Sequence, residues 1–113
     1  MKRNIVYEKA FDFALKVIKL YKTMIEKNEY VLSKQVLRSA TSIGANIKEA
    51  LNAQSRKDFL SKMNIALKES SETVYWLELL LASGYLKTKE LLNDCDEINK
   101  MLASIVKKVK KTL

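Results

Sequence analysis

Residues 55–86 read SRKDFLSKMNIALKESSETVYWLELLLASGYL and carry the signals for one long helix, from its start to its end. Ser55 is a candidate N-cap because its hydroxyl can accept a hydrogen bond from the backbone N–H of Asp58. Gly84 suits the left-handed conformation with which many helices end. The predicted core column is Leu60, Leu67, Val74 and Leu81, flanked by Phe59, Ala66, Thr73 and Leu80. We therefore expect one amphipathic helix between Ser55 and Ser83.

Apolar residues at helical spacing predict three further helices, over about residues 4–27, 31–54 and 88–113. Gly44 lies inside the second of these, at a cost of about 1 kcal/mol relative to alanine, and suggests a close approach by a neighbouring helix. The last helix has a predicted seam of Leu91, Cys95, Ile98, Leu102, Ile105 and Val109. Because the connections are short, consecutive helices should pack antiparallel. The expected fold is all-α, an antiparallel up-down-up-down four-helix bundle forming a single domain over residues 1–113.

The composition argues against an all-β fold and against most enzyme classes. The 113 residues are 48% hydrophobic, with two glycines, no proline and no histidine. Turns in β-proteins need glycine and proline, and zinc sites and general acid–base catalysis commonly need histidine. We expect a protein without catalytic activity, metal or cofactor. Cys95 has no second cysteine as a disulfide partner, and no apolar run reaches the length of a membrane span, so we expect a soluble, cytoplasmic protein that makes no membrane contact.

The formal net charge of +8 favours a polyanionic partner, although it also serves solubility. The expected topology places the start of the first helix, the second turn and the C-terminus at the same end. The candidate nucleic-acid-binding residues there are Lys2, Arg3, Lys48, Arg56, Lys57, Lys107, Lys108, Lys110 and Lys111. The alternative for the last four is a solvated helix end that complements its own dipole. Since no aromatic residue lies among the terminal lysines, we expect contacts to the phosphate backbone rather than base stacking.

Two further groups of residues are candidates for an oligomer interface or a polar cluster between helices. On the second helix, Arg38, Ser42, Asn46 and Glu49 share one face. Glu49 and Asn46 could bind backbone donors at the start of the next helix, pair with Arg38 of a neighbouring copy, or face a ligand. Residues 74–82 are apolar almost all round, so Tyr75, Trp76 and Leu79 need a partner beyond one bundle core. That partner is either a second copy or the fourth helix.

The central segments resemble a known bacterial family. Residues 35–50 read QVLRSATSIGANIKEA, residues 55–59 read SRKDF, and residues 66–77 read ALKESSETVYWL. This pattern resembles the four-helix-bundle family of 23S rRNA intervening sequence proteins, with Ala50 where the family often has glycine. The resemblance implies an antiparallel bundle that assembles into a ring-shaped homopentamer. A related branch, the accessory proteins of diversity-generating retroelements, binds nucleic acid and a reverse transcriptase.

Two functional hypotheses follow from the charge, the apolar surface and the resemblance. The first is a homo-oligomer that binds nucleic acid, RNA in preference to DNA, through phosphate contacts at the lysine-rich end. The second is a protein-interaction scaffold, such as an accessory factor for an RNA-processing or reverse-transcribing enzyme. Nuclease-sensitive and nuclease-resistant partner binding would distinguish the two.

Overall fold

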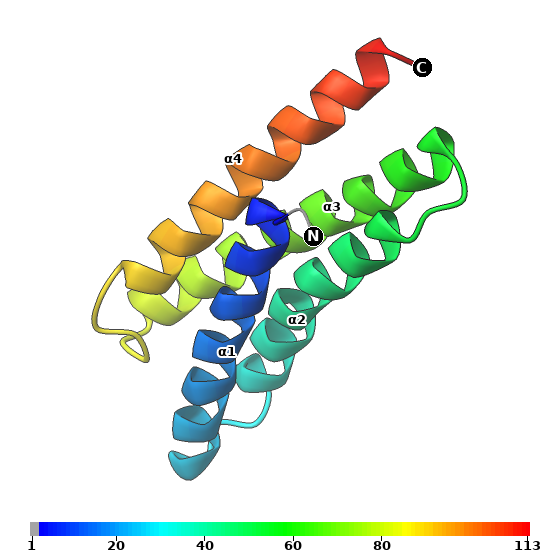
Figure 1. Cartoon of the computed structure of the whole chain (residues 1–113). Helices are drawn as coiled ribbons and strands as arrows, with labels where there is room; N and C mark the ends of the chain where they lie inside the picture. The colour runs from blue at the N-terminus through cyan, green and yellow to red at the C-terminus, as the bar shows by residue number, and fades with distance from the viewer. Residues whose placement is uncertain (1–2) are drawn as a thin grey trace.

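The computed structural model describes residues 3–113 and contains four helices within them. The helices are α1 (Ile5–Glu26), α2 (Leu32–Leu51), α3 (Arg56–Ala82) and α4 (Glu90–Lys111). Each helix packs against the next in the opposite direction, and α4 returns to contact α1 (Figure 1). The predicted all-α, up-down-up-down bundle is confirmed. The predicted bounds differ most at the end of the second helix, which stops at Leu51 instead of Gln54.

Both predicted end signals of α3 are present. The Ser55 hydroxyl accepts a hydrogen bond from the Asp58 backbone N–H at 3.0 Å, and the Asp58 carboxylate accepts one from the Gln54 N–H at 3.3 Å. At the other end, Gly84 has a φ of +87°. The backbone N–H groups of Tyr85 and Gly84 reach back to the carbonyls of Leu80 and Leu81, at 2.9 and 3.2 Å. This is a Schellman motif, which satisfies carbonyls that the helix end would leave unpaired.

The turn between α1 and α2 repeats that motif with a different residue. Asn28 has a φ of +63°, and the Glu29 N–H bonds to the Met24 carbonyl at 2.9 Å. The Glu29 carboxylate then accepts hydrogen bonds from the N–H groups of Leu32 and Ser33, at 2.9 and 2.8 Å, and so caps α2. Burial alone would raise the pKa of Glu29, but these hydrogen bonds outweigh it and hold the pKa below its ordinary value.

The core of α3 corrects the predicted column. Met63, Ser70 and Leu77 are buried, together with Ala66, Thr73 and Leu80, whereas Leu60, Leu67, Val74 and Leu81 are only partly buried. Ser70 can be buried in place of a predicted apolar residue because its hydroxyl donates a hydrogen bond to the Leu67 carbonyl at 2.8 Å. On α4 the predicted seam holds through Leu102, and buried Val106 then replaces the partly exposed Ile105 and Val109.

The contact between α2 and α3 contains a buried hydrogen bond between side chains. Ser39 and Thr73 are both fully buried, and their hydroxyl oxygens lie 2.8 Å apart. Farther along α2, Gly44 lies against α1, where a Cβ atom added to it would stand 3.8 Å from the Cβ atom of Ala10. The predicted close approach is therefore an ordinary van der Waals contact.

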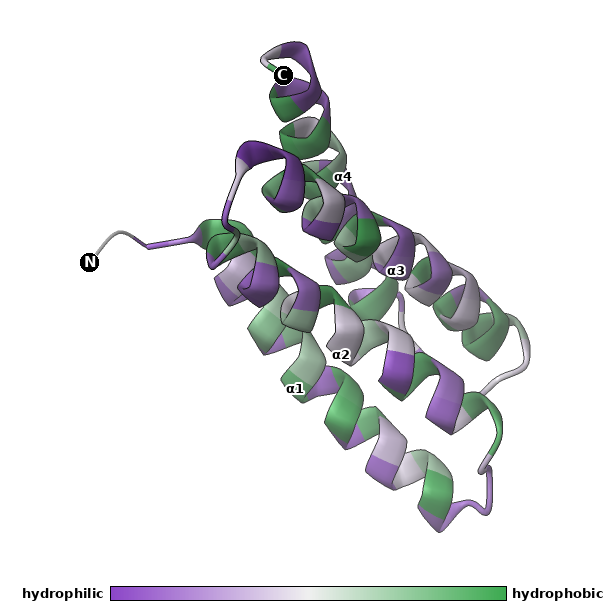
Figure 2. Cartoon of the chain, turned by 90° about the vertical axis from the view of Figure 1, so that its right-hand side faces the viewer, coloured by the Kyte–Doolittle hydropathy of each residue, from purple (hydrophilic) through white to green (hydrophobic). Residues whose placement is uncertain are grey.

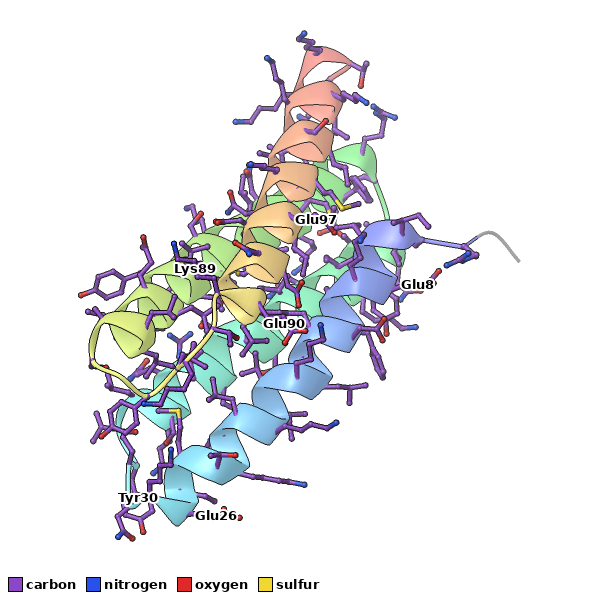
Figure 3. All side chains as sticks on the ribbon, turned by 90° about the vertical axis from the view of Figure 1, so that its left-hand side faces the viewer. Glu8, Glu26, Tyr30, Lys89, Glu90 and Glu97 are labelled. Atoms are coloured by element: carbon purple, nitrogen blue, oxygen red, sulfur yellow. The ribbon has the colours of Figure 1, made fainter. Side chains whose placement is uncertain are left out.

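The contact between α1 and α4 is bridged by ion pairs. Lys16 pairs with Asp94 at 2.8 Å and with Glu90 at 3.3 Å, and Lys9 pairs with Glu97. Figure 3 shows Glu90 and Glu97 on the side of α4 next to α1. The ion pairs cross a cavity of about 170 Å³, with Phe13 and Ile98 among its lining residues.

Cys95 lies in the core, fully buried, with its sulfur 3.5 Å from the Ser70 carbonyl oxygen. Burial raises the pKa of the Cys95 thiol to about 12, and the charges of Asp96 and Asp94 add to the rise. Within residues 3–113, no helix combines the length and the apolar character needed to cross a membrane. The same residues bring no three His, Cys, Asp or Glu side chains into position around one metal ion.

Candidate nucleic-acid interface

The basic end of the bundle consists of the last turn of α2, the turn between α2 and α3, and the last turns of α4. The start of α1, which the sequence predicted at this end, is set back from it (Figure 1). In Figure 1, α4 and the α2–α3 hairpin run past the start of α1 toward this end. Figure 2 shows strongly hydrophilic residues at the α2–α3 turn and near the C-terminus. Seven predicted residues lie here with exposed side chains and form no ion pair within residues 3–113: Lys48, Arg56, Lys57, Lys107, Lys108, Lys110 and Lys111.

A direct contact joins two of these basic segments. The Arg56 guanidinium, at the first position of α3, donates a hydrogen bond to the Thr112 hydroxyl just beyond α4. The contact brings Arg56 and Lys57 beside the four terminal lysines. Lys48 of α2 lies over the ring of Tyr7 in α1, with its Nζ 5.4 Å from the ring centroid. Arg56 of α3 therefore meets the end of α4, whereas Lys48 contacts the start of α1.

Of the two remaining predicted residues, Arg3 forms an ion pair. Arg3 donates two hydrogen bonds to the Glu8 carboxylate, at 2.8 and 3.1 Å. The pKa of Arg3 is raised by hydrogen bonding and by the charge of Glu8, while the same hydrogen bonding lowers the pKa of Glu8. Arg3, which precedes α1, is therefore ion-paired with a residue in the first turn of that helix. Lys2 lies outside the described residues.

Helix α4 separates its charges along its length. Its acidic residues Glu90, Asp94, Asp96 and Glu97 all lie in its first half, and its lysines begin at Lys100. The ion pairs to Lys9 and Lys16 hold three of those carboxylates far from the basic end. This order suits the helix dipole, which favours anions at the N-terminus and cations at the C-terminus. It also leaves no acidic residue of α4 after Glu97 to offset the positive field of the C-terminal lysines.

A groove opens between the basic segments. It has a volume of about 410 Å³, and its lining includes Leu51, Gln54, Arg56, Phe59 and Val109. The last residue of α2, the α2–α3 turn, the first turn of α3 and the end of α4 all contribute to it. No aromatic residue lies among the terminal lysines in the sequence, but the fold brings Phe59 into the groove that Val109 also lines. Only the relative placement of three helices reveals this neighbour.

The second predicted group lies along α2 and α3, and its member Glu49 directly follows Lys48 in the last turn of α2. Arg38 pairs with Glu72 and, at 3.4 Å, with Glu69, both on α3 of its own chain. The hydroxyl of Ser42 donates to the Arg38 carbonyl at 2.7 Å, and the Asn46 amide donates to the Ser42 carbonyl at 2.8 Å.

The Glu49 carboxylate lies 3.6 Å from the Lys62 ammonium nitrogen, and the Asn46 amide is bonded within α2. The predicted capping of α3 by Asn46 and Glu49 is therefore wrong. Ser55 and Asp58 perform that capping instead.

The aromatic residues of the second group extend this polar network. Trp76 donates its indole N–H to Glu72 at 2.9 Å, and Tyr75 packs edge-on against Trp76 with ring centroids 5.2 Å apart. Trp76 is partly buried, whereas Tyr75 is 54% exposed and Leu79 is 36% exposed. Helix α4 therefore leaves part of this apolar face uncovered.

Comparison with known proteins places the chain in a family. Residues 2–104 match the model of the 23S rRNA-intervening sequence protein family. The chain belongs to this family. A solved structure described as a protein with unknown function from the S23 ribosomal protein family of Bacteroides thetaiotaomicron is 54% identical in sequence. That match covers 90% of this chain and 98% of the other, with a TM-score of 0.87. The comparison with curated proteins found no match.

Membership in the 23S rRNA-intervening sequence protein family confirms the resemblance seen in residues 35–50 and 66–77 and agrees with the four-helix fold. The family match ends at residue 104, before the four terminal lysines. The charges of this chain, rather than the family match, define the candidate interface.

Proposed function

We propose that this chain is a non-catalytic, cytoplasmic, homo-oligomeric protein that binds nucleic acid, with RNA preferred over DNA, through phosphate contacts at its basic end. The observation that carries the proposal is the group of exposed cations that α3 and α4 bring together around Arg56 and Thr112, none of them ion-paired among residues 3–113. The family name, which refers to sequences inserted in 23S rRNA, supports RNA as the preferred ligand.

The chemistry of these residues suits phosphates better than specific base edges. Lysine ammonium groups are point charges on flexible stems, and they bind phosphate by attraction and counterion release. One such end is a weak site, but several copies in a ring would hold one strand at several points. Oligomerisation would thus raise affinity without a new contact.

Exposed apolar residues support self-association. Tyr75 and Leu79 form the uncovered part of α3, and Phe11 and Leu15 are 53% and 49% exposed on α1. Two different apolar faces on one chain can form a heterologous contact, which closes into a ring when its rotation allows. The resemblance favours a pentamer. Analytical ultracentrifugation should show a single oligomer larger than a dimer, and a monomer throughout the micromolar range would contradict self-association.

The first test is binding by the nuclease-treated protein to a single-stranded RNA and to a DNA duplex of the same length. The logarithm of the binding constant should fall steeply as salt rises from about 50 to 200 mM, because phosphate contacts release counterions. RNA should bind more tightly than the duplex at each salt concentration. An absence of binding at the lowest salt would contradict the proposal.

A matched pair of variants locates the binding surface. We expect replacement of Lys107, Lys108, Lys110 and Lys111 by serine to weaken RNA binding at least about tenfold and to reduce the salt slope by as much as about 3. The control replaces Lys22, Lys27, Lys87 and Lys89, which are exposed at the opposite end, and removes the same charge. The control should bind nearly as tightly as the unmodified protein. Equal losses in both variants would mean that net charge, rather than the basic end, governs binding.

A scaffold or accessory role for an RNA-processing or reverse-transcribing enzyme is the second candidate. The exposed ring of Tyr75, packed on Trp76 and next to Leu79, favours it, because aromatic residues are enriched at protein interfaces. Affinity purification before and after nuclease treatment tests this role. A partner retained after nuclease treatment and lost on Tyr75→Ser would support direct protein binding.

A further inference from the structure

We infer that the groove at the basic end receives one unpaired nucleobase of the bound strand, stacked on Phe59. The inference rests on the proposed function, which it deepens from phosphate binding to recognition of single-stranded nucleic acid. It also revises the expectation from sequence that base stacking plays no part at this end.

The groove exists because α1 starts too far from the basic end to cover it. Tyr7 lies beside Lys48, so the first turns of α1 meet the last turns of α2. Lys9 pairs with Glu97, and α4 continues past that level to Lys111. The ends of α2 and α4 and the start of α3 therefore surround an opening of about 410 Å³. This volume falls in the range of about 300–1,000 Å³ typical of pockets for small organic groups.

The lining offers both surfaces that an unpaired base requires. Phe59 is partly buried and held by the core, and it lines the groove between Leu51 and Val109. Gln54 is exposed at the rim, and its side-chain amide forms no hydrogen bond within residues 3–113. A base can stack on an aromatic ring while a free amide donates to and accepts from its edge. Arg56 stands at the same rim, where the strand's phosphates would pass.

The charges around the groove select this occupant over others. Two other pockets of the molecule have carboxylates in their lining: Asp12, Asp94 and Glu97 together with Lys9 and Lys16 in one, and Glu8 and Asp12 in the other. Neither offers the excess of positive charge that would attract a phosphate strand. The groove at the basic end has Arg56 in its lining and no acidic residue. An apolar floor with a cationic rim matches a nucleotide, whose flat base is attached to a negatively charged backbone.

The experiment compares two fluorescein-labelled RNA strands of about 12 nucleotides, a length within the site sizes of single-strand binders. One strand is complete, and in the other every second nucleotide is abasic, so the phosphates are the same. The full-length protein should bind the complete strand at least about fivefold more tightly, since one stacked base commonly contributes that much or more. Phe59→Leu should abolish the preference and leave the salt slope unchanged.

Two further variants test whether a loss of the preference comes from the groove itself or from unfolding of the protein. Leu51→Gln changes a residue that is 45% exposed, keeps the charge, and should reduce the preference. Tyr30→Leu removes an aromatic ring that is 53% exposed in the distant α1–α2 turn, and it should retain the preference in full. Circular dichroism of each variant confirms that the bundle is folded.

The outcomes separate this inference from the function on which it rests. Equal affinity for both strands with a steep salt slope would overturn the base site and leave phosphate binding in place. No binding of either strand would overturn both. Equal affinities, together with Phe59-dependent binding of an acidic, leucine-containing helical peptide, would assign the groove to a protein partner and overturn the base site.

Discussion

Between α2 and α3 the helix–helix contact is the most extensive in the bundle, whereas between α4 and α1 it is the least extensive. The first contact buries the hydroxyls of Ser39 and Thr73 against each other. The second places Lys16 between Asp94 and Glu90, with all three side chains at least 36% exposed. The α2–α3 contact has a buried hydrogen bond at its centre and ion pairs at its edge, whereas the α1–α4 contact is bridged by exposed ion pairs.

This difference indicates how the bundle divides its stability. Surface ion pairs contribute little because water and salt screen them, whereas buried polar groups are costly to leave unpaired. The α2–α3 seam should therefore determine whether the bundle folds, and the α1–α4 seam should open first. The α1–α4 seam is also the one that no direct chain connection closes.

The largest loss of stability should come from removing the buried hydrogen bond between α2 and α3. Thr73→Val keeps the shape of the side chain but removes one buried hydroxyl, and it should lower the free energy of unfolding by about 1–3 kcal/mol. Urea denaturation measures the change. Adding Ser39→Ala removes the other partner, so the double variant should be less destabilised than the sum of the two single variants. Simple additivity would mean that the two hydroxyls do not stabilise each other.

Two glycine variants should have opposite effects. Gly44 lies in the contact between α1 and α2, whereas Gly84 lies in the turn that ends α3. Gly44→Ala should stabilise the protein by up to about 1 kcal/mol, because alanine favours the helix and its Cβ would meet only ordinary contacts. Gly84→Ala should instead cost about 1–2 kcal/mol, since its φ of +87° strains any residue with a Cβ. Thermal denaturation of both variants measures the contrast. Destabilisation by Gly44→Ala would show that α1 lies closer to α2 than the 3.8 Å contact indicates.

The smallest loss of stability should come from removing the ion pairs between α1 and α4. Lys16→Ala should lower Tm by at most about 4 °C at low salt, and 0.5 M salt, roughly where screening extends only a few ångströms, should remove the difference. Hydrogen bonding to Asp94 and Glu90 raises the pKa of Lys16 above 10.5. Its contribution is therefore complete below that pH and is lost as pH rises through the folded-state pKa. A larger loss that persists in high salt would contradict the comparison.

Local signals in the sequence predicted the ends of α3 well. The Ser55 cap and the Gly84 turn each depend on hydrogen bonds within a few residues, so spacing alone was enough to locate them. The buried column of α3 was harder to predict, because Ser70 and Thr73 look polar in a hydrophobicity pattern. Their hydroxyls bond to backbone carbonyls one turn earlier, and that pairing makes burial possible.

The candidate site was predicted in part for a related reason. Its cations follow from topology, since antiparallel helices bring Arg56 and the terminal lysines to one end. The groove depends on how far α1 is offset along α4, which the ion pair between Lys9 and Glu97 reports. That offset is a long-range property without a local motif. Phe59 therefore appeared in the sequence only as a residue flanking the core.

The buried thiol of Cys95 can be used to measure how often the bundle opens, because only an opened bundle exposes it to a reagent. It is the only cysteine in the chain, and burial raises its pKa to about 12. An exposed cysteine, with an ordinary pKa of about 8.5, reacts readily with alkylating reagents at mildly basic pH. Each alkylation event in a native sample would therefore record a moment when α4 had parted from α3, and the rate of labelling would time that motion without any engineered probe.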